Sequence, residues 1–123
     1  MSSSNTSSAK REEPIFTEEL NRKYFFSETG FSDWKEDLLE FVSDDFVRKW
    51  SSGTETEKYI ASQKIDSWMY VTTLSTYYNI AWWNDENGKK EAIDFLTEVL
   101  KIAEEKNLGR IIRGISRILQ RVP

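Results

Sequence analysis

Residues 89–106 have the sequence KKEAIDFLTEVLKIAEEK, and this stretch carries the clearest fold signal in the chain. Its apolar side chains recur every three or four residues, which places them on one face of an α-helix. The apolar positions are Ala92, Phe95, Leu96, Val99, Leu100 and Ala103. The other face is charged and comprises Glu91, Asp94, Glu98, Lys101 and Glu105. The segment therefore predicts an amphipathic helix that covers a hydrophobic core.

Four further segments around this one also predict helices. A hydroxyl residue followed by acids is typical of a helix start, and this pattern precedes residues 18–26 and 33–50. The sequence Thr54-x-x-Glu57 forms a capping box at the start of a helix over 55–83, which either runs straight through or bends midway. The last helix is expected over 110–121, after a stop signal that contains Gly109.

These segments predict an all-α fold, a compact bundle of four to five helices joined by short turns. The chain has 123 residues, which suits one domain. Residues 1–13 offer almost nothing to bury, so we expect a disordered tail there and a single helical domain over 14–123. Both antiparallel and orthogonal packing of the helices remain compatible with the pattern.

The composition restricts the chemistry that this chain can perform. It contains no cysteine and no histidine. Those two side chains most often serve as the nucleophile, the general base or the transition-metal ligand near neutral pH. The sequence also lacks the phosphate-loop, nucleophile-elbow and dinucleotide-binding motifs. We therefore expect a protein that is not an enzyme and that needs no cofactor and no metal.

The expected location follows from the same kind of reasoning. The start, MSSSNTSSAKREEP, has no apolar stretch of the kind that forms a signal peptide. The most apolar stretch, residues 65–83, contains Asp66, Asn79 and several hydroxyl residues, so it does not predict a transmembrane helix. We expect a cytoplasmic protein.

The last predicted helix carries the arginine row, which consists of Arg110, Arg113, Arg117 and Arg121. No acid follows Glu105, although the whole chain has a net charge of -4, so positive charge is concentrated at this end. Arginine binds carboxylate and phosphate groups in a bidentate way, which favours a recognition surface. Pairing with acids on neighbouring helices would explain the row equally well.

Three kinds of partner would suit an arginine row that is not paired internally. We favour an acidic protein surface, because a net charge of -4 argues against general affinity for nucleic acid or anionic membranes. A phosphate backbone and an anionic lipid surface are the alternatives. Contact between the row and acids on a second copy of the chain would give self-association.

A second row of like charges lies on the predicted helix over 33–50. This acidic row consists of Asp33, Glu36, Asp37, Glu40 and Asp44. Carboxylates at this spacing can bind hard cations, but neither a calcium-binding loop nor an Asp-x-Asp pair accompanies them. We interpret the row as a solvated helix face or a contact for a partner.

An aromatic block occupies the second half of the predicted helix over 55–83. It consists of Trp68, Tyr70, Tyr77, Tyr78, Trp82 and Trp83. The rings surround the helix, which is typical of a helix buried in a bundle. Rings in excess of the core would instead form an interaction surface or line a pocket. Because neighbouring helix positions differ by about 100°, we expect one ring of the Trp82–Trp83 pair to be exposed or in an interface.

The sequence thus favours a protein-binding module, such as a small adaptor, regulator or assembly factor. The expected partner-binding residues are Arg110, Arg113, Arg117, Arg121, Tyr78, Trp82 and Trp83. The expected partner is a protein with an acidic surface or a second copy of the chain. The alternatives are a nucleic-acid-associated regulator that contacts phosphates through the last helix and a bundle that binds a small hydrophobic ligand.

Overall fold

The all-α prediction is confirmed by the computed structural model, which describes residues 13–122. Within that range the chain forms six α-helices, one 3₁₀ turn and no strand. The prediction of four to five helices was therefore too low. The predicted disordered tail lies outside the described residues, apart from Glu13.

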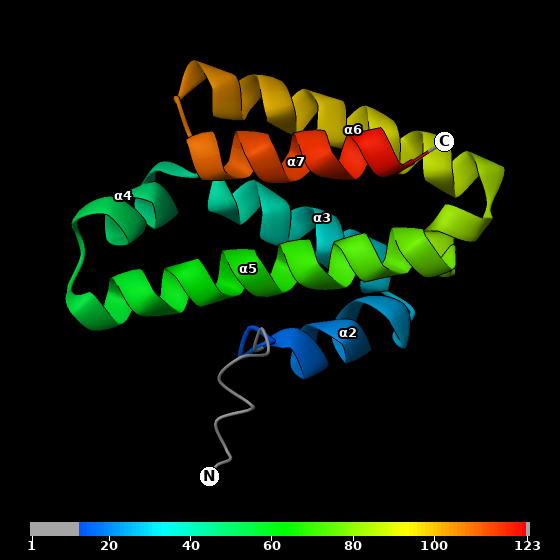
Figure 1. Ribbon diagram of the computed structural model, residues 1–123, viewed down its shortest axis with the longest axis horizontal. Coiled ribbons are helices and arrows are strands. Elements are labelled where there is room, and N and C mark those ends of the chain that lie inside the picture. Colours follow the sequence, from blue (N-terminus) through cyan, green and yellow to red (C-terminus); the bar gives the residue numbers. More distant parts are fainter. Residues whose placement is uncertain (1–12, 123) are drawn as a thin grey trace, which may run out of the picture.

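The helices follow one another with short connections. They are α2 (Thr17–Phe25), α3 (Gly30–Phe41), α4 (Asp44–Ser52), α5 (Glu55–Tyr78), the 3₁₀ turn η1 (Ala81–Asn84), α6 (Glu86–Glu105) and α7 (Gly109–Arg121). In Figure 1, α5 runs along the whole molecule, α6 and α7 form a hairpin on one side of it, and α2 lies on the other side. The ribbon also shows that α5 and α7 run in the same direction (Figure 1).

The additional helix arises from a break between α3 and α4, where the sequence predicts one helix over 33–50. The Ser43 hydroxyl accepts a hydrogen bond from the Phe46 N–H (3.3 Å) and donates one to the Glu40 carbonyl (2.7 Å). A serine that bonds in this way ends one helix and caps the next. Phe46 is buried on the far side of the break.

The sequence predicts the start of α5 correctly but not its end. The capping box is present, because Thr54 Oγ1 accepts the Glu57 N–H (3.1 Å) and the Glu57 carboxylate accepts the Thr54 N–H (2.9 Å). The helix then stops at Tyr78, because Asn79 adopts the left-handed conformation with φ of 53°. The residues expected at the end of this helix lie instead in η1.

Three tryptophans form the centre of the core. Trp34 and Trp68 stack with ring centroids 5.1 Å apart, and Trp83 meets Trp34 edge-on at 5.9 Å. Each indole N–H has an acceptor: Trp34 donates to Thr72 Oγ1 (2.8 Å), Trp68 to the Trp34 carbonyl (3.0 Å) and Trp83 to Ser75 Oγ (2.7 Å). Because every polar edge is paired, these large rings can be buried without leaving a donor unsatisfied.

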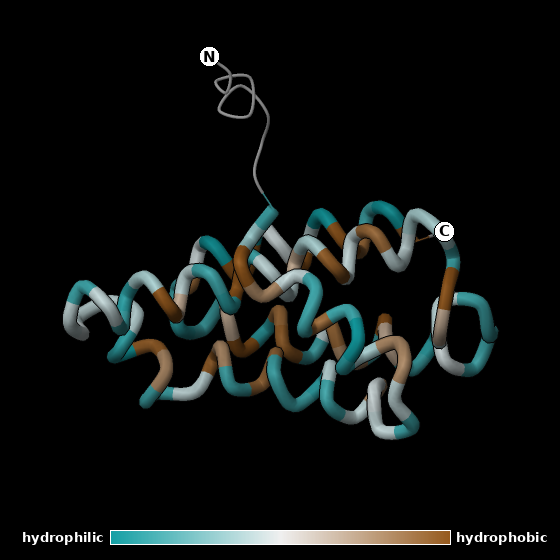
Figure 2. Tube along the Cα trace, turned by 90° about the horizontal axis from the view of Figure 1, so that it is seen from below, coloured by the Kyte–Doolittle hydropathy of each residue, from teal (hydrophilic) through white to brown (hydrophobic). Residues whose placement is uncertain are grey.

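Along the outside of the bundle the trace is mainly hydrophilic (Figure 2), with hydrophobic segments gathered between the helices. Gly114 allows α7 to pack closely against α5, because a Cβ at that position would lie 2.5 Å from Met69 Sδ. A glycine inside a helix weakens the helix itself, and here it permits the two helices to pack at short distance. None of the helices within residues 13–122 combines the length and apolar character needed to cross a bilayer.

Candidate functional site

The arginine row lies on the outer side of α7, opposite the isoleucines that face the core. Ile111, Ile115 and Ile118 are buried, whereas Arg113, Arg117 and Arg121 are exposed. This arrangement follows from the sequence, because apolar and cationic residues alternate at helical spacing along α7.

Only one member of the row is paired internally. Arg110 is half-buried and donates to the Asp66 carboxylate on α5 at 3.0 Å. The other three arginines form no ion pair with any residue in the range 13–122. Internal pairing, one of the two interpretations of the row, therefore applies to Arg110. The guanidinium groups of Arg113, Arg117 and Arg121 face solvent.

A shallow groove of about 600 Å³ follows α7 where it meets α5. We call it the arginine groove; its lining consists of Pro14, Asp66, Met69, Tyr70, Thr73, Arg110, Arg117 and Arg121. Asp66, the acid in this lining, already accepts a hydrogen bond from Arg110. Arg117 and Arg121 therefore give the groove an uncompensated positive charge beside the ring of Tyr70.

The last turn of α5 and the residues after it carry exposed apolar side chains. This aromatic end consists of Leu74, Tyr77, Tyr78 and Ile80. The two tyrosines are 67% and 65% exposed, and their rings meet edge-on at 5.0 Å. Exposed tyrosines of this kind supply much of the contact energy in protein interfaces.

The backbone beside the aromatic end is strained. Ala81 has φ of 57°, in the left-handed region that costs a residue with a Cβ roughly 1–2 kcal/mol. The hydrogen bond from Trp83 Nε1 to Ser75 holds η1 in place after this residue. Strained backbone is often found at functional sites, and Ala81 lies in the chain between the exposed Tyr78 and the buried Trp83.

The arginine groove and the aromatic end are neighbours along α5. Thr73 lines the groove together with Arg121, and Tyr77 follows Thr73 by one helical turn. Val122, which directly follows α7, lines a small hollow with Thr76 and Asn79 at the end of α5. The last turns of α5 and α7 therefore lie together, and cationic and aromatic side chains share this face.

The tryptophan pair was predicted at consecutive positions of the long helix over 55–83, but it lies in η1. Trp83 is 1% exposed and belongs to the core. Trp82 is half-buried and stacks on Phe31 at 4.6 Å, next to Phe25 at 5.1 Å. Its buried Nε1 has no hydrogen-bond acceptor within the described part of the chain. Neighbouring positions in a 3₁₀ turn differ by about 120°, and the two indoles accordingly pack against different partners: Trp83 meets Trp34 in the core, and Trp82 packs against Phe25 and Phe31.

The predicted partner-binding residues include Tyr78 but none of the other exposed residues of the aromatic end. Leu74, Tyr77 and Ile80 are exposed like Tyr78, and all four residues lie at or near the end of α5, which is Tyr78. The signal for this stop was Asn79, since asparagine tolerates the left-handed conformation that ends many helices. Ending the predicted helix there would have separated the tyrosines from the tryptophans.

The acidic row is engaged by other parts of the fold at three of its positions. Asp37 accepts hydrogen bonds from Tyr24 Oη (2.6 Å) and Lys23 Nζ (3.0 Å) on α2. Asp44 accepts one from Lys106 Nζ (2.9 Å), and Asp33 accepts one from the Thr29 hydroxyl (2.9 Å) at the start of α3. Asp37 and Asp44 therefore join segments of the bundle, whereas the contact of Asp33 is local to the start of α3.

Burial and the nearby Asp37 carboxylate raise the pKa of the Tyr24 hydroxyl well above its ordinary value of 10.0. Tyr24 is 1% exposed, so its neutral hydroxyl serves as a hydrogen-bond donor inside the fold. This part of the acidic row is therefore structural.

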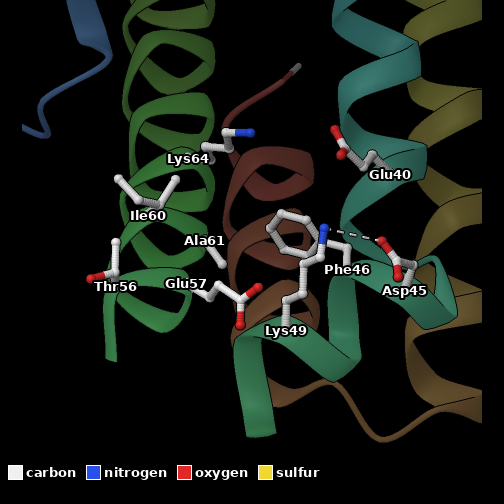
Figure 3. A pocket seen from close by; sticks show the side chains of 9 residues that line it. All are labelled: Glu40, Asp45, Phe46, Lys49, Thr56, Glu57, Ile60, Ala61 and Lys64. Atoms are coloured by element: carbon white, nitrogen blue, oxygen red, sulfur yellow. Dashed lines mark ion pairs between the residues drawn. The ribbon is translucent and has the colours of Figure 1, made fainter. Parts of the chain in front are cut away.

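Two smaller hollows adjoin the other side of α5, and one of them is shown in Figure 3. It has a volume of about 230 Å³ between α4 and α5, with Phe46, Ile60 and Ala61 as its apolar walls. Hydrogen bonding to Arg48 and the nearby Lys49 ammonium lower the pKa of Asp45 at its rim. The second hollow, of about 220 Å³, shares Glu40 and Lys64 with the first. Each is smaller than the ~300–1,000 Å³ typical of ligand pockets.

The described residues hold no cluster of three or more acids that could bind a metal ion. No protein-family model, curated protein or solved structure matches this chain. Function must therefore be inferred from the arrangement of the side chains.

Proposed function

We propose that this protein is a non-enzymatic protein-binding module, such as an adaptor, regulator or assembly factor, for partners with an acidic surface. The observation that carries the proposal is that the arginine groove and the aromatic end are neighbours along α5. Arg117 and Arg121 line the groove and form no ion pair with residues 13–122, and the exposed pair Tyr77 and Tyr78 follows the groove on α5.

The two parts of this surface would contribute in different ways. Tyr77 and Tyr78 supply contact area at a low cost in conformational entropy, because a tyrosine side chain has few rotatable bonds. Arg117 and Arg121 steer an acidic partner into place and set its orientation by bidentate hydrogen bonds. Trp82 packs on Phe25 and Phe31, and Trp83 is buried beside Trp34, so both would act on binding through the fold and not through direct contact.

Affinity capture from native lysate tests the proposal with matched variants. Arg117→Glu/Arg121→Glu reverses two charges on the groove, and Lys90→Glu/Lys101→Glu reverses two exposed charges on α6 as a control. We expect a specific partner to be lost with the arginine variant and kept with the lysine variant. If both variants lose the partner equally, binding depends on overall charge and not on the groove, which would contradict the proposal.

The aromatic end is tested in the same assay. Tyr77→Ala/Tyr78→Ala should weaken binding by about 30-fold or more, the effect of losing an interface hot spot of about 2 kcal/mol. Tyr59→Ala is the control, because Tyr59 is 53% exposed on the first half of α5. An unchanged affinity in the double tyrosine variant would remove the aromatic end from the proposal.

The nucleic-acid alternative makes a different prediction. If the arginine row contacts phosphates, the logarithm of the affinity falls steeply and linearly with the logarithm of salt concentration. A protein partner anchored by tyrosines responds less, because burial of apolar area is not screened by salt. We favour the protein partner, since the arginine groove adjoins exposed tyrosines and the whole chain has a net charge of -4.

A further inference from the structure

The N-terminal segment enters the fold at the arginine groove. Pro14 is part of the groove lining. The following backbone is fixed to α5, because the Ile15 N–H donates to Gln63 Oε1 (2.9 Å) and the Phe16 N–H donates to Ser67 Oγ (3.0 Å). Thr17 also donates to the Pro14 carbonyl (2.7 Å). Whatever precedes Pro14 is thus tethered at the edge of the surface proposed for binding.

The sequence of this segment is rich in hydroxyl groups. Within residues 2–8 every position except Asn5 is serine or threonine. The cations Lys10 and Arg11 are followed at once by the acids Glu12 and Glu13, so the side chains of residues 1–13 carry no net charge. The unmodified segment therefore has no net electrostatic attraction to the arginines, whereas each phosphate group would add a charge of about -1.5 to -2.

The hydroxyl groups are within reach of the arginines. Ser8 lies six residues before Pro14, and an extended chain of that length spans roughly 20 Å at about 3.3 Å per residue. The whole arginine row, from Arg110 to Arg121, extends over only about 17 Å of helix at 1.5 Å per residue. A phosphate on Ser7 or Ser8 can therefore meet Arg117 or Arg121 without any change in the bundle.

We propose that the hydroxyl cluster before Pro14 is a phosphorylation site and that the phosphorylated segment occupies the arginine groove in place of an acidic partner. A protein kinase supplies the phosphoryl group from a nucleoside triphosphate. The serine oxygen forms a new bond to the γ-phosphorus, the bond to the leaving nucleoside diphosphate breaks, and the hydroxyl proton is released. The proposed competition rests on the protein-binding function, whereas docking of the segment does not require it.

Physical chemistry favours this occupant for two reasons. Arginine guanidinium groups bind phosphate oxygens in a bidentate way, more strongly than they bind a neutral side chain. A short tether also gives its end an effective concentration of the order of millimolar, so even a weak contact with the groove competes well with a dilute partner.

The first experiment compares the full chain phosphorylated on Ser7 and Ser8 with the unmodified chain. Side-chain Nε–H resonances of arginine are recorded by ¹H–¹⁵N NMR. We expect phosphorylation to shift the signals of Arg117 and Arg121 and to leave those of Arg22 and Arg48 in place. Shifts that do not change on dilution show that the contact is within one chain. Identical arginine spectra with and without phosphate would overturn the proposal.

The second experiment measures competition and uses an octaglutamate peptide as the acidic probe. Phosphorylation should weaken binding of this peptide at least about tenfold, as expected for an intramolecular competitor at millimolar effective concentration. The chain with Ser7→Ala/Ser8→Ala, treated with the same kinase, should bind the peptide as the unmodified chain does. Unchanged peptide affinity after phosphorylation would contradict the competition.

The two experiments separate this proposal from the proposed function. If octaglutamate shifts the Arg117 and Arg121 signals and phosphorylation does not, the groove remains an acidic-partner site and docking of the segment is wrong. If phosphorylation shifts these signals and octaglutamate does not, docking stands, while competition and an acidic protein partner lose their support.

Discussion

The acidic row and the arginine row are alike in sequence, each a line of like charges at helical spacing, but the fold uses them differently. Asp33, Asp37 and Asp44 accept hydrogen bonds from other side chains of the bundle. In the arginine row, Arg110 alone pairs with an acid among residues 13–122. Asp37 and Asp44 of one row therefore join segments of the bundle, whereas Arg113, Arg117 and Arg121 of the other row are exposed.

The difference comes from what lies opposite each row. α2 packs across α3 and brings Tyr24 and Lys23 to Asp37, so the carboxylate meets two donors at once. The outer face of α7 meets α5 only along one edge, where Asp66 is the single acid within ion-pair distance of the row among the described residues. A row of charges thus becomes structural when a neighbouring helix supplies partners of opposite sign or suitable hydrogen bonds.

The largest expected effect tests how closely α2 and α3 must approach. A Cβ on Gly30 would lie 1.8 Å from the Tyr24 carbonyl oxygen, and the backbone cannot move aside cheaply. Gly30→Ala should lower the free energy of unfolding by about 3 kcal/mol or more, at the upper end of overpacking effects. Chemical denaturation measures this loss.

Gly109→Ala, at the start of α7, is the matched control for Gly30→Ala. Its Cβ would meet only the flexible end of Arg113, at 3.1 Å, and alanine favours a helix more than glycine does. We expect no loss of stability. Equal losses in the two variants would show that the contrast between these regions is wrong.

Removing one charge from each row should have unequal effects on stability. Asp37→Ala leaves the buried Tyr24 hydroxyl without its acceptor, which costs about 2 kcal/mol. Arg117→Ala removes an exposed side chain that has no ion pair within residues 13–122, so the free energy of unfolding should change by less than about 0.5 kcal/mol. Urea denaturation measures the free energy of unfolding of both variants. Similar losses would contradict the distinction between an acidic row that stabilises the fold and an arginine row that does not.

Alkaline pH offers a measurement of the same contact without changing Asp37. The folded state raises the pKa of Tyr24 above 10.0, so it holds the proton more tightly than the unfolded chain does. This contribution to stability is fully present below pH 10 and is lost as pH rises further, with a slope of up to about 1.4 kcal/mol per pH unit. Tyr24→Phe should remove this part of the slope. If the wild-type protein and Tyr24→Phe lose stability equally between pH 10 and 11, ionisation of Tyr24 does not cause the loss.

The smallest effect concerns the end of the acidic row. Lys106 Nζ donates to the Val42 carbonyl (2.6 Å) and to Asp44 (2.9 Å). Lys106→Ala should lower the free energy of unfolding by about 0.5–1 kcal/mol, because the ion pair is largely exposed to solvent. Lys101→Ala on the outer face of α6 should change it less. Thermal melts compare the two variants, and equal melting temperatures would show that the Lys106 contacts contribute nothing.

Much of the helical pattern could be predicted from local sequence. The amphipathic spacing located α6 and α7, and the capping box located the start of α5. The break at Ser43 and the stop at Asn79 were missed, because serine and asparagine occur both inside helices and at their ends. Whether such a residue ends a helix depends on whether the surrounding side chains pack more favourably when the helix is interrupted.

The sequence by itself determined that this protein is helical and that its positive charge is concentrated in the last helix, because both properties follow from the order of residue types along the chain. Only the tertiary structure decided which charges and rings are available. Trp83 is buried and Tyr77 is exposed although both belong to one aromatic block, and Arg110 is paired although Arg117 is not. These outcomes depend on contacts between helices that are distant in sequence, and no local pattern encodes them.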